Sequence, residues 1–174
     1  MKKLEDYIIS IPDFPKPGII FRDVTGILDS AEALQMSVDG IREKLKGVDY
    51  NQVVGPESRG FIFGVPVAYA ERRPFAPIRK KGKLPRETIS QEYDLEYGTA
   101  TVEIHKDAIR PGDKVVIIDD LLATGGTMEA NIKLIEKLGG EVVKIVCLIE
   151  LAGLKGRERL KNYDVESLVV YEGK

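Results

Sequence analysis

Several features that would identify a protein class are scarce or missing in this chain. Its 174 residues contain one cysteine and one histidine, and no run of about 18 apolar residues long enough to cross a membrane. A lone cysteine cannot form a disulfide within the chain, so Cys147 is expected to be a small buried residue of a protein in the reducing cytoplasm. A lone histidine gives little support to a histidine-based zinc site or a Ser-His-Asp triad, and His105 is expected at the surface or at an interface.

An excess of one charge is also missing. The 26 Lys and Arg residues nearly balance the 28 Asp and Glu residues, so the net charge of −2 gives no reason to expect nucleic acid as a partner. Residues 1–6 lead into no apolar signal region, and neither secretion nor a membrane is expected. Internal repeats and low-complexity tracts are absent, and residues 1–174 have the length of a single domain.

Residues 115–127 are the most informative part of the sequence. They begin with apolar β-branched residues, which predict a buried strand that ends at Asp119 and Asp120. A loop rich in threonine and glycine follows. The next segment has apolar residues at helical spacing, namely Met128, Ile132, Ile135 and Leu138. The sequence therefore predicts a strand, a short loop and the start of a helix in direct succession.

A loop of this kind is suited to binding a phosphate. The N-terminus of a helix presents free backbone N–H groups and the positive end of the helix dipole. Gly125 and Gly126 allow close approach of the backbone, and Thr124 and Thr127 add hydroxyl donors. The preceding aspartates would repel a phosphate and are better suited to sugar hydroxyls or a nearby magnesium ion. The segment thus predicts a site for a ribose 5-phosphate.

Other phosphate-binding loops fit the sequence less well. A Walker-type loop needs a lysine at the start of the helix, and no lysine lies between Lys114 and Lys133. A dinucleotide fingerprint needs Gly-x-Gly-x-x-Gly and an acidic residue after the next strand, and neither is present. An ordinary tight turn capped by Thr127 would account for the glycines, but it would leave the pair of aspartates unexplained.

Elsewhere in the chain, predicted strands alternate with predicted helices. Helices are expected at residues 4–11, 30–47, 61–70, 126–138 and about 154–160. In the helix at 61–70, Pro66 is expected near the first turns. Strands are expected at residues 53–54, 75–79, 114–118, 142–149 and 165–170, and residues 93–97 and 99–104 form an antiparallel ribbon. This alternation indicates a doubly wound, mostly parallel α/β sheet with flanking helices, whose ligand crevice lies at the carboxyl ends of the strands.

A second strand–loop–helix and a basic segment add two further anion-binding candidates. Residues 55–60 follow a strand, and the guanidinium of Arg59 in this loop can donate charge-assisted hydrogen bonds to an anion. Residues 79–83 place four positive charges around one glycine. A run of charge is often only a solvated surface. Beside two anion loops, this run is better explained as the cation that neutralises a departing pyrophosphate.

The motif Asp-Asp-x-x-x-Thr-Gly-Gly-Thr after an apolar strand resembles that of the type I phosphoribosyltransferases, in the version found in members that act on adenine. The resemblance extends almost from end to end, through residues 20–23, 57–61, 79–85, 95–98 and 150–157. It implies a small N-terminal hood of about residues 1–30 and a flexible antiparallel β-ribbon lid of about residues 84–98.

The resemblance also implies a role for individual residues. Those expected at the ribose 5-phosphate are Asp119, Asp120, Ala123, Thr124, Gly125, Gly126 and Thr127. Those expected at the pyrophosphate are Glu57, Ser58, Arg59, Arg79, Lys80 and Lys83, with a cis peptide between the first two. Those expected at adenine are Ile20, Phe21, Arg22 and Leu151. For Phe21 and Leu151, ordinary core packing is a competing interpretation.

The same resemblance assigns catalysis to two residues of the lid. Glu96 corresponds to the acid/base that hydrogen-bonds N7 of the purine, and Tyr97 would cover the reacting centre. The alternative is that Glu96 is one more exposed strand acid, because it alternates with Glu92 and Asp94 along one face.

The implied function is transfer of the 5-phosphoribosyl group from 5-phosphoribosyl 1-pyrophosphate to adenine, giving AMP and pyrophosphate in purine salvage. Mg²⁺ is the expected cofactor, bound through substrate and water rather than directly, and the family implies a homodimer. Two alternatives stay open: a phosphoribosyltransferase for another purine, and a regulator on the same fold that senses the phosphoribosyl substrate without turnover. Residues 20–22 and Leu151 weigh against the first, and Glu96 and the lack of appended DNA-binding helices weigh against the second.

Overall fold

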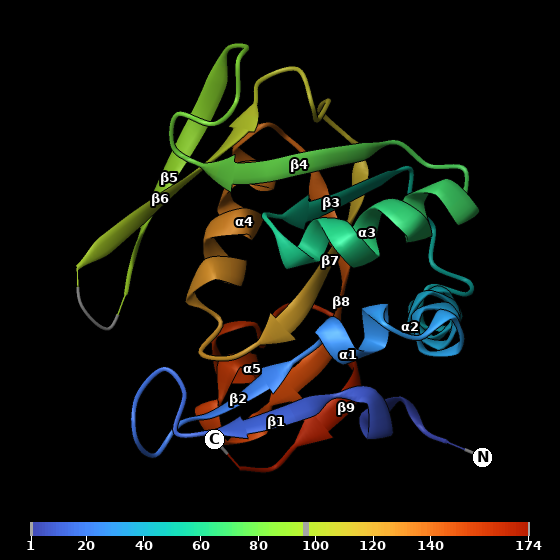
Figure 1. The fold of residues 1–174 in the computed structure, drawn as a ribbon. Helices are drawn as coiled ribbons and strands as arrows, with labels where there is room; N and C mark the ends of the chain where they lie inside the picture. Colours follow the sequence, from blue (N-terminus) through green and yellow to red (C-terminus); the bar gives the residue numbers. More distant parts are fainter. Residues whose placement is uncertain (1, 96–97, 174) are drawn as a thin grey trace.

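The protein, described here by a computed structural model for residues 2–95 and 98–173, is built around one seven-stranded sheet (Figure 1). The strand order is β5-β6-β4-β3-β7-β8-β9. The strands are β3 (Gln52–Pro56), β4 (Phe75–Lys80), β5 (Thr88–Asp94), β6 (Thr99–His105), β7 (Lys114–Leu122), β8 (Glu141–Leu151) and β9 (Val165–Tyr171). Strands β4, β3, β7, β8 and β9 run parallel, whereas β6 pairs antiparallel with both β4 and β5. The expected mostly parallel sheet with an antiparallel ribbon is confirmed.

Helices cover both faces of this sheet. They are α1 (Thr25–Leu28), α2 (Ala31–Lys44), α3 (Arg59–Ala70), α4 (Gly126–Lys137) and α5 (Gly156–Arg159), with short 3-10 turns η1 (Leu4–Tyr7) and η2 (Ala152–Leu154). On one face, α1, α2 and α3 pack over Val53 and Val116. On the other, α4 packs over Val54, Ile117 and Cys147, which is buried as predicted. Because successive strand residues point to opposite faces, strands covered on both sides are apolar throughout.

The N-terminal segment forms a small two-stranded hairpin beside the main sheet. Strands β1 (Ile9–Pro12) and β2 (Ile20–Asp23) pair antiparallel, and Ile11 lies opposite Phe21. The helix expected at residues 4–11 is therefore wrong, because after the single turn η1 the chain pairs with β2 instead of continuing the helix. Residues 13–18 between the two strands are irregular, as expected from their prolines.

Three smaller predictions are also corrected. Strand β7 continues past the pair of aspartates to Leu122, because it keeps pairing with β8 to that point. Pro66 lies in the interior of α3 and not near its first turns; the helix continues because Val67 and Ala68 after it pack in the core. His105 is buried rather than exposed, and its Nε2 accepts the backbone N–H of Arg86 at 3.4 Å. Within residues 2–95 and 98–173, no helix is long and apolar enough to cross a membrane.

Candidate active site

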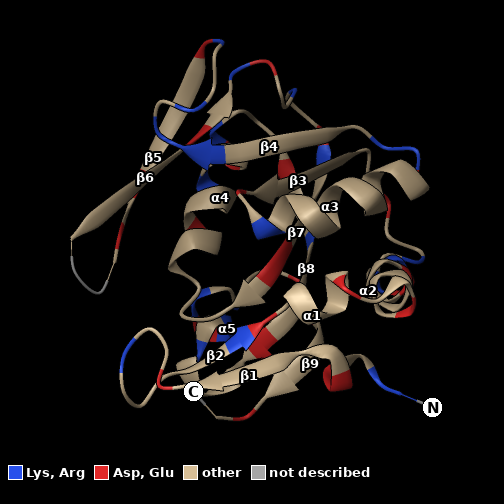
Figure 2. Cartoon of the chain, in the orientation of Figure 1, with Lys and Arg blue, Asp and Glu red and all other residues tan. Residues whose placement is uncertain are grey.

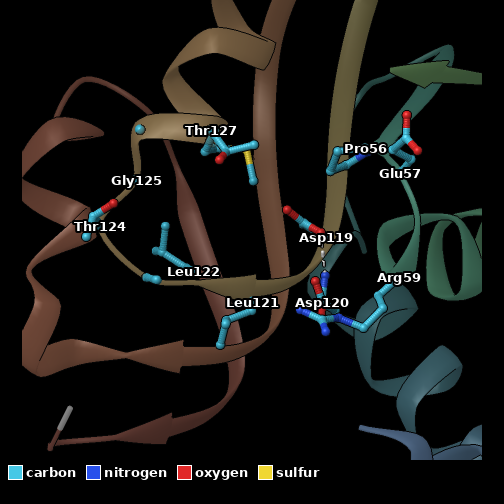
Figure 3. Close-up of a pocket in the computed structure, with 13 residues that line it drawn as sticks. Pro56, Glu57, Arg59, Asp119, Asp120, Leu121, Leu122, Thr124, Gly125 and Thr127 are labelled. Atoms are coloured by element: carbon cyan, nitrogen blue, oxygen red, sulfur yellow. Dashed lines mark hydrogen bonds and ion pairs between the residues drawn. The ribbon is translucent and has the colours of Figure 1, made fainter. Parts of the chain in front are cut away.

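A pocket of about 230 Å³ lies at the carboxyl ends of β3 and β7 (Figure 3). Its lining comes from the end of β3 and the start of α3, and from the continuous segment that joins β7 to α4. The lining residues are Pro56, Glu57, Arg59, Asp119, Asp120, Leu121, Leu122, Ala123, Thr124, Gly125, Gly126, Thr127 and Met128. The crevice thus lies where a doubly wound sheet is expected to bind its ligand.

The loop between β7 and α4 forms one wall of this pocket, with Thr124, Gly125 and Thr127 along it (Figure 3). Gly125 is the N-cap of α4 and has a φ of 83°, a left-handed conformation that strains other residues. Helix α4 starts at Gly126, and so the unpaired N–H groups of its first turn lie at the pocket. All seven residues predicted for the ribose 5-phosphate line this one pocket.

The two aspartates are almost completely shielded from water. Asp119 is 9% exposed and Asp120 is 7% exposed. The Asp119 Oδ1 atom accepts the backbone N–H of Asp120 at 2.8 Å. Burial raises the pKa of Asp119 well above its ordinary value, and the neighbouring Asp120 carboxylate raises it further. Burying two neighbouring carboxylates lowers the stability of the folded protein unless hydroxyl donors or positive charge, such as a ligand supplies, compensate for it.

Arg59 connects the two halves of the pocket. It is the first residue of α3, and its Nε donates a hydrogen bond to Oδ2 of Asp120 (Figure 3). Its side chain lines the pocket and is still 42% exposed. The guanidinium carbon also lies 5.6 Å from the ring centroid of Phe21, which brings the N-terminal hairpin next to the site.

The loop that carries Arg59 is fastened to the end of β4. The peptide bond between Glu57 and Ser58 is cis, as the resemblance implied. Oε1 of Glu57 accepts the backbone N–H of Lys80 and lies 3.5 Å from Nε of Arg79. The end of β4 and the segment after it are basic (Figure 2). Of the six residues predicted for the pyrophosphate, Glu57 and Arg59 line the pocket, and Ser58, Arg79, Lys80 and Lys83 do not.

The residues predicted at adenine also lie outside the pocket lining. Ile20, Phe21 and Arg22 belong to β2, and Phe21 packs edge-on against Phe14 with ring centroids 5.3 Å apart. The Arg22 guanidinium stacks 3.9 Å from the ring centroid of Tyr171. Leu151, at the end of β8, is 8% exposed and belongs to the core beneath α1, α2 and α3. Their contact with a purine remains a prediction.

Glu96 and Tyr97 lie outside the described residues. The strands on either side of them pair up to Asp94 and Thr99. The carbonyl oxygen of Asp94 is 3.7 Å from the position that a Cβ on Gly126 would take. Asp94, the last residue of β5, therefore lies beside the loop between β7 and α4.

Sequence reasoning did not single out four of the lining residues, namely Pro56, Leu121, Leu122 and Met128. The sequence predicts Met128 on the apolar face of its helix. In the structure it packs in the core on that face, and it is only 3% exposed. Their position in the sequence could have indicated them, because each of the four is directly adjacent to a residue with a predicted role. Apolar side chains at these positions exclude water from the polar groups between them.

The comparisons with known proteins agree with this geometry. The model of the phosphoribosyl transferase domain matches residues 28–172. The chain is 66% identical over 174 residues to the adenine phosphoribosyltransferase of Lachnoclostridium phytofermentans, covering 100% of both. It is 50% identical to the crystal structure of adenine phosphoribosyltransferase from Thermoanaerobacter pseudethanolicus, with a TM-score of 0.94 over 97% of this chain and 100% of that one.

A more distant structure shows what such a fold can hold. The adenine phosphoribosyltransferase of Trypanosoma brucei, in complex with AMP, pyrophosphate and ribose-5-phosphate, is 26% identical and has a TM-score of 0.87, covering 96% of this chain and 77% of that one. With a family match over most of its length and a relative this similar from end to end, the chain belongs to the phosphoribosyl transferase domain family and, within it, to the adenine phosphoribosyltransferases.

Proposed function

We propose that the pocket between β3 and β7 binds 5-phosphoribosyl 1-pyrophosphate and transfers its phosphoribosyl group to adenine, releasing AMP and pyrophosphate. This is the reaction of purine salvage catalysed by the family to which the chain belongs. The observation that carries the proposal is a single pocket that joins a helix N-terminus for a phosphate with two buried carboxylates for a sugar. A pyrophosphate-release assay tests it, since a regulator that only binds the substrate would release none.

The loop Ala123 to Thr127 binds the 5-phosphate in this proposal. Backbone N–H groups at the start of α4 and the hydroxyls of Thr124 and Thr127 act as donors, and the helix dipole favours the negative charge. Asp119 and Asp120 accept hydrogen bonds from the ribose hydroxyls. Those hydroxyls donate to carboxylates that have little other contact with solvent, which makes binding of the sugar favourable.

The pyrophosphate lies on the other side of the pocket, at the cis Glu57–Ser58 peptide and the start of α3. We expect Arg59 to contact it, because its side chain lines the pocket and remains 42% exposed after pairing with Asp120. Arg79 and Lys80, at the end of β4, contact Glu57 of this loop, and Lys83 adds positive charge in the basic segment that follows (Figure 2). Positive charge held here stabilises the leaving group as the bond to the ribose carbon breaks.

Adenine is placed between the N-terminal hairpin and the end of β8. Phe21 would stack on the base, Leu151 would close the opposite side, and the backbone at Ile20 and Arg22 would read the 6-amino edge. The proximity of Phe21 to Arg59 supports this placement, because it brings the hairpin to the pyrophosphate side of the pocket. A fixed carbonyl acceptor and N–H donor would pair with adenine and leave a 6-oxo purine with unpaired polar groups.

Glu96 and Tyr97 complete the proposal as the groups that act on the incoming base. Glu96 would hold a proton at N7 of the purine, and Tyr97 would cover the reacting centre and exclude water. The closeness of Asp94 to Gly126 supports this, because the segment that follows Asp94 begins at the edge of the phosphate loop.

We include Mg²⁺ as the cofactor, bound through the substrate and water. The fit rests on the two carboxylates at the pocket, whose oxygens can accept hydrogen bonds from water molecules bound to the ion. Within the described residues, no group of three or more His, Cys, Asp or Glu side chains is arranged to hold a metal, so most ligands would come from the substrate. When bound, the ion neutralises phosphate charge.

We further propose a homodimer that works in the cytoplasm. The exposed side of α3 is apolar: Val65 is 47% exposed and Tyr69 is 87% exposed. Such a helix face is better buried against a second copy than left in water. Light scattering coupled to size-exclusion chromatography, with Tyr69→Glu as the disrupting variant, tests the dimer, and cell fractionation tests the location.

A further inference from the structure

The phosphate loop rests directly on the backbone of α5. A Cβ on Gly156 would overlap the carbonyl oxygen of Ala123 and lie 3.0 Å from Cδ1 of Leu122. A Cβ on Gly125 would lie 2.8 Å from the carbonyl oxygen of Gly156. Since real Cβ atoms do not come this close to backbone, both positions have to be glycine. Figure 1 shows α5 next to the loop that joins β7 to α4.

The helix that supports the loop cannot hold its own position. It has four residues, Gly156–Arg159, which is a single turn and far too short to be stable alone. The residue before it, Lys155, has a φ of 58°, so the chain also enters α5 through an unfavourable backbone conformation. Contacts from outside α5 must therefore fix where Gly156 lies.

Arg157 supplies three of these contacts. Its Nε and Nη2 atoms donate to the two carboxylate oxygens of Glu150, both at 2.7 Å, and Nη1 donates to the carbonyl oxygen of Val165 at 2.6 Å. Ser167 donates a further hydrogen bond to Glu150 at 2.8 Å. The hydrogen bonds from Arg157 hold the pKa of Glu150 below its ordinary value. This bidentate pair ties α5 to β8 and β9 in one geometry.

The Arg157–Glu150 pair also lies next to the start of the phosphate loop. Glu150 lies opposite Leu122 in the register of β7 and β8, and Leu122 is the last residue of β7 before the loop begins at Ala123. The Glu150 side chain is only 6% exposed, so its geometry is set by the protein rather than by water. The same carboxylate thus fixes α5 next to the strand end from which the loop departs.

We propose that Arg157, through its fork with Glu150, is a positioning residue for the 5-phosphate: it holds Gly156 against Ala123 and Gly125 and so sets the conformation of the loop. Neither side chain of the pair lines the pocket. The inference rests on the proposed role of the loop in binding the 5-phosphate. Loss of the fork would let α5 and the loop move, and ordering them again on binding would cost affinity.

The test uses Arg157→Met, which removes the fork but keeps an apolar stem, and Arg157→Lys, which keeps the charge but not the two-pronged geometry. The matched control is Arg42→Met. Arg42, on α2, donates to Glu71 at the C-terminal end of α3 at 2.6 Å, and neither residue lines the site pocket. Isothermal titration with ribose 5-phosphate is combined with steady-state kinetics in both substrates and with melting temperatures.

For Arg157→Met we expect the Kd of ribose 5-phosphate and the KM of the phosphoribosyl substrate to rise about 10-fold or more. The KM of adenine and the kcat at saturation should stay within about twofold. Arg157→Lys should be intermediate, and Arg42→Met should leave both phosphate constants unchanged even if it melts earlier. A purely structural role would instead lower the melting temperature of both Met variants without this selective change.

The inference is overturned if Arg157→Met leaves the Kd of ribose 5-phosphate within about twofold, or raises the KM of both substrates equally. If Arg157→Met does not fold, Arg157→Lys decides by the same criteria, because it keeps the charge and loses only the two-pronged geometry. Thr127→Val in the same titration separates this inference from the proposed function. If that variant also binds ribose 5-phosphate normally, the loop is not the phosphate site; if it loses binding while Arg157→Met does not, only the positioning role fails.

Discussion

Asp119 accepts the backbone N–H of Asp120 at 2.8 Å, while the Asp120 carboxylate pairs with Arg59. The two neighbouring carboxylates are therefore held in different ways. Asp120 is paired with the cationic side chain of Arg59, whereas Asp119 accepts a backbone N–H. Burial raises the pKa of Asp119, and the charge of Asp120 raises it further. A buried acid without a cation is a source of instability that a binding site tolerates for its ligand.

Asp119→Asn should make the unliganded protein more stable at neutral pH and weaken binding of the phosphoribosyl substrate. Because the folded pKa of Asp119 is raised, the folded state binds the proton more tightly, and stability falls as the pH rises from about 4 through that pKa. Asparagine has no proton to lose, so the gain should appear above about pH 4 and vanish below it. Melting curves across pH measure this, at about 2–4 °C for each kcal/mol. An unchanged or lower melting temperature at neutral pH would refute the argument.

Arg59→Met should destabilise the fold by about 1–3 kcal/mol, because Asp120 is left buried without its partner. Combining it with Asp120→Asn should recover most of that loss, since the uncompensated charge is then gone. Urea unfolding of wild type, both single variants and the double variant completes the cycle. Additive effects of the two substitutions would mean that the ion pair is not the reason for the loss.

Gly125→Ala should abolish binding of AMP while adenine binding is largely kept. The new Cβ meets the carbonyl of Gly156 and the φ of 83° is unfavourable for alanine, so the loop loses the conformation that binds phosphate. Gly112→Ala is the matched control, since Gly112 has a φ of 89° with nothing within 4 Å of its Cβ position. Titration calorimetry compares the ligands. Equal losses for AMP and adenine would indicate general misfolding instead.

Glu96→Gln should slow the chemical step by about 10²–10⁴-fold while the affinity for adenine barely changes, if Glu96 acts as a general acid or base. Glu92→Gln is the control, because Glu92 is an exposed acid on the same ribbon. Single-turnover rates are the right measurement, since product release or lid opening can hide chemistry at steady state. A chemical step within about twofold of wild type would remove Glu96 from this role and make Tyr97 the next candidate.

The parts that the sequence predicted well are those in which the chemistry is local. Residues 119–127 contain the carboxylates, the donors and the glycines in one stretch, so their shared pocket follows from spacing. The segment 4–11 shows the opposite case. Its apolar residues fit a helix, but Ile9 and Ile11 also alternate, and pairing with β2 decided between the two patterns.

Contacts between distant segments could not be derived in this way. The Arg59–Asp120 pair spans 61 residues, and nothing in either local pattern indicates it. The close contact between the backbones of Gly125 and Gly156 cannot be derived from the sequence pattern either. Resemblance did mark residues 150–157, but a role for Gly156 and Arg157 appears only when the loop is seen to rest on α5.

The adenine phosphoribosyltransferase reaction is measured by the conversion of radiolabelled adenine to AMP in the presence of 5-phosphoribosyl 1-pyrophosphate and Mg²⁺. Guanine, hypoxanthine and xanthine run in parallel, together with the Asp119→Asn and Asp120→Asn double variant. We expect labelled AMP from adenine, little or no product from the three 6-oxo purines, and a strongly raised KM for the phosphoribosyl substrate in the double variant. Absence of AMP, or equal turnover of a 6-oxo purine, would contradict it.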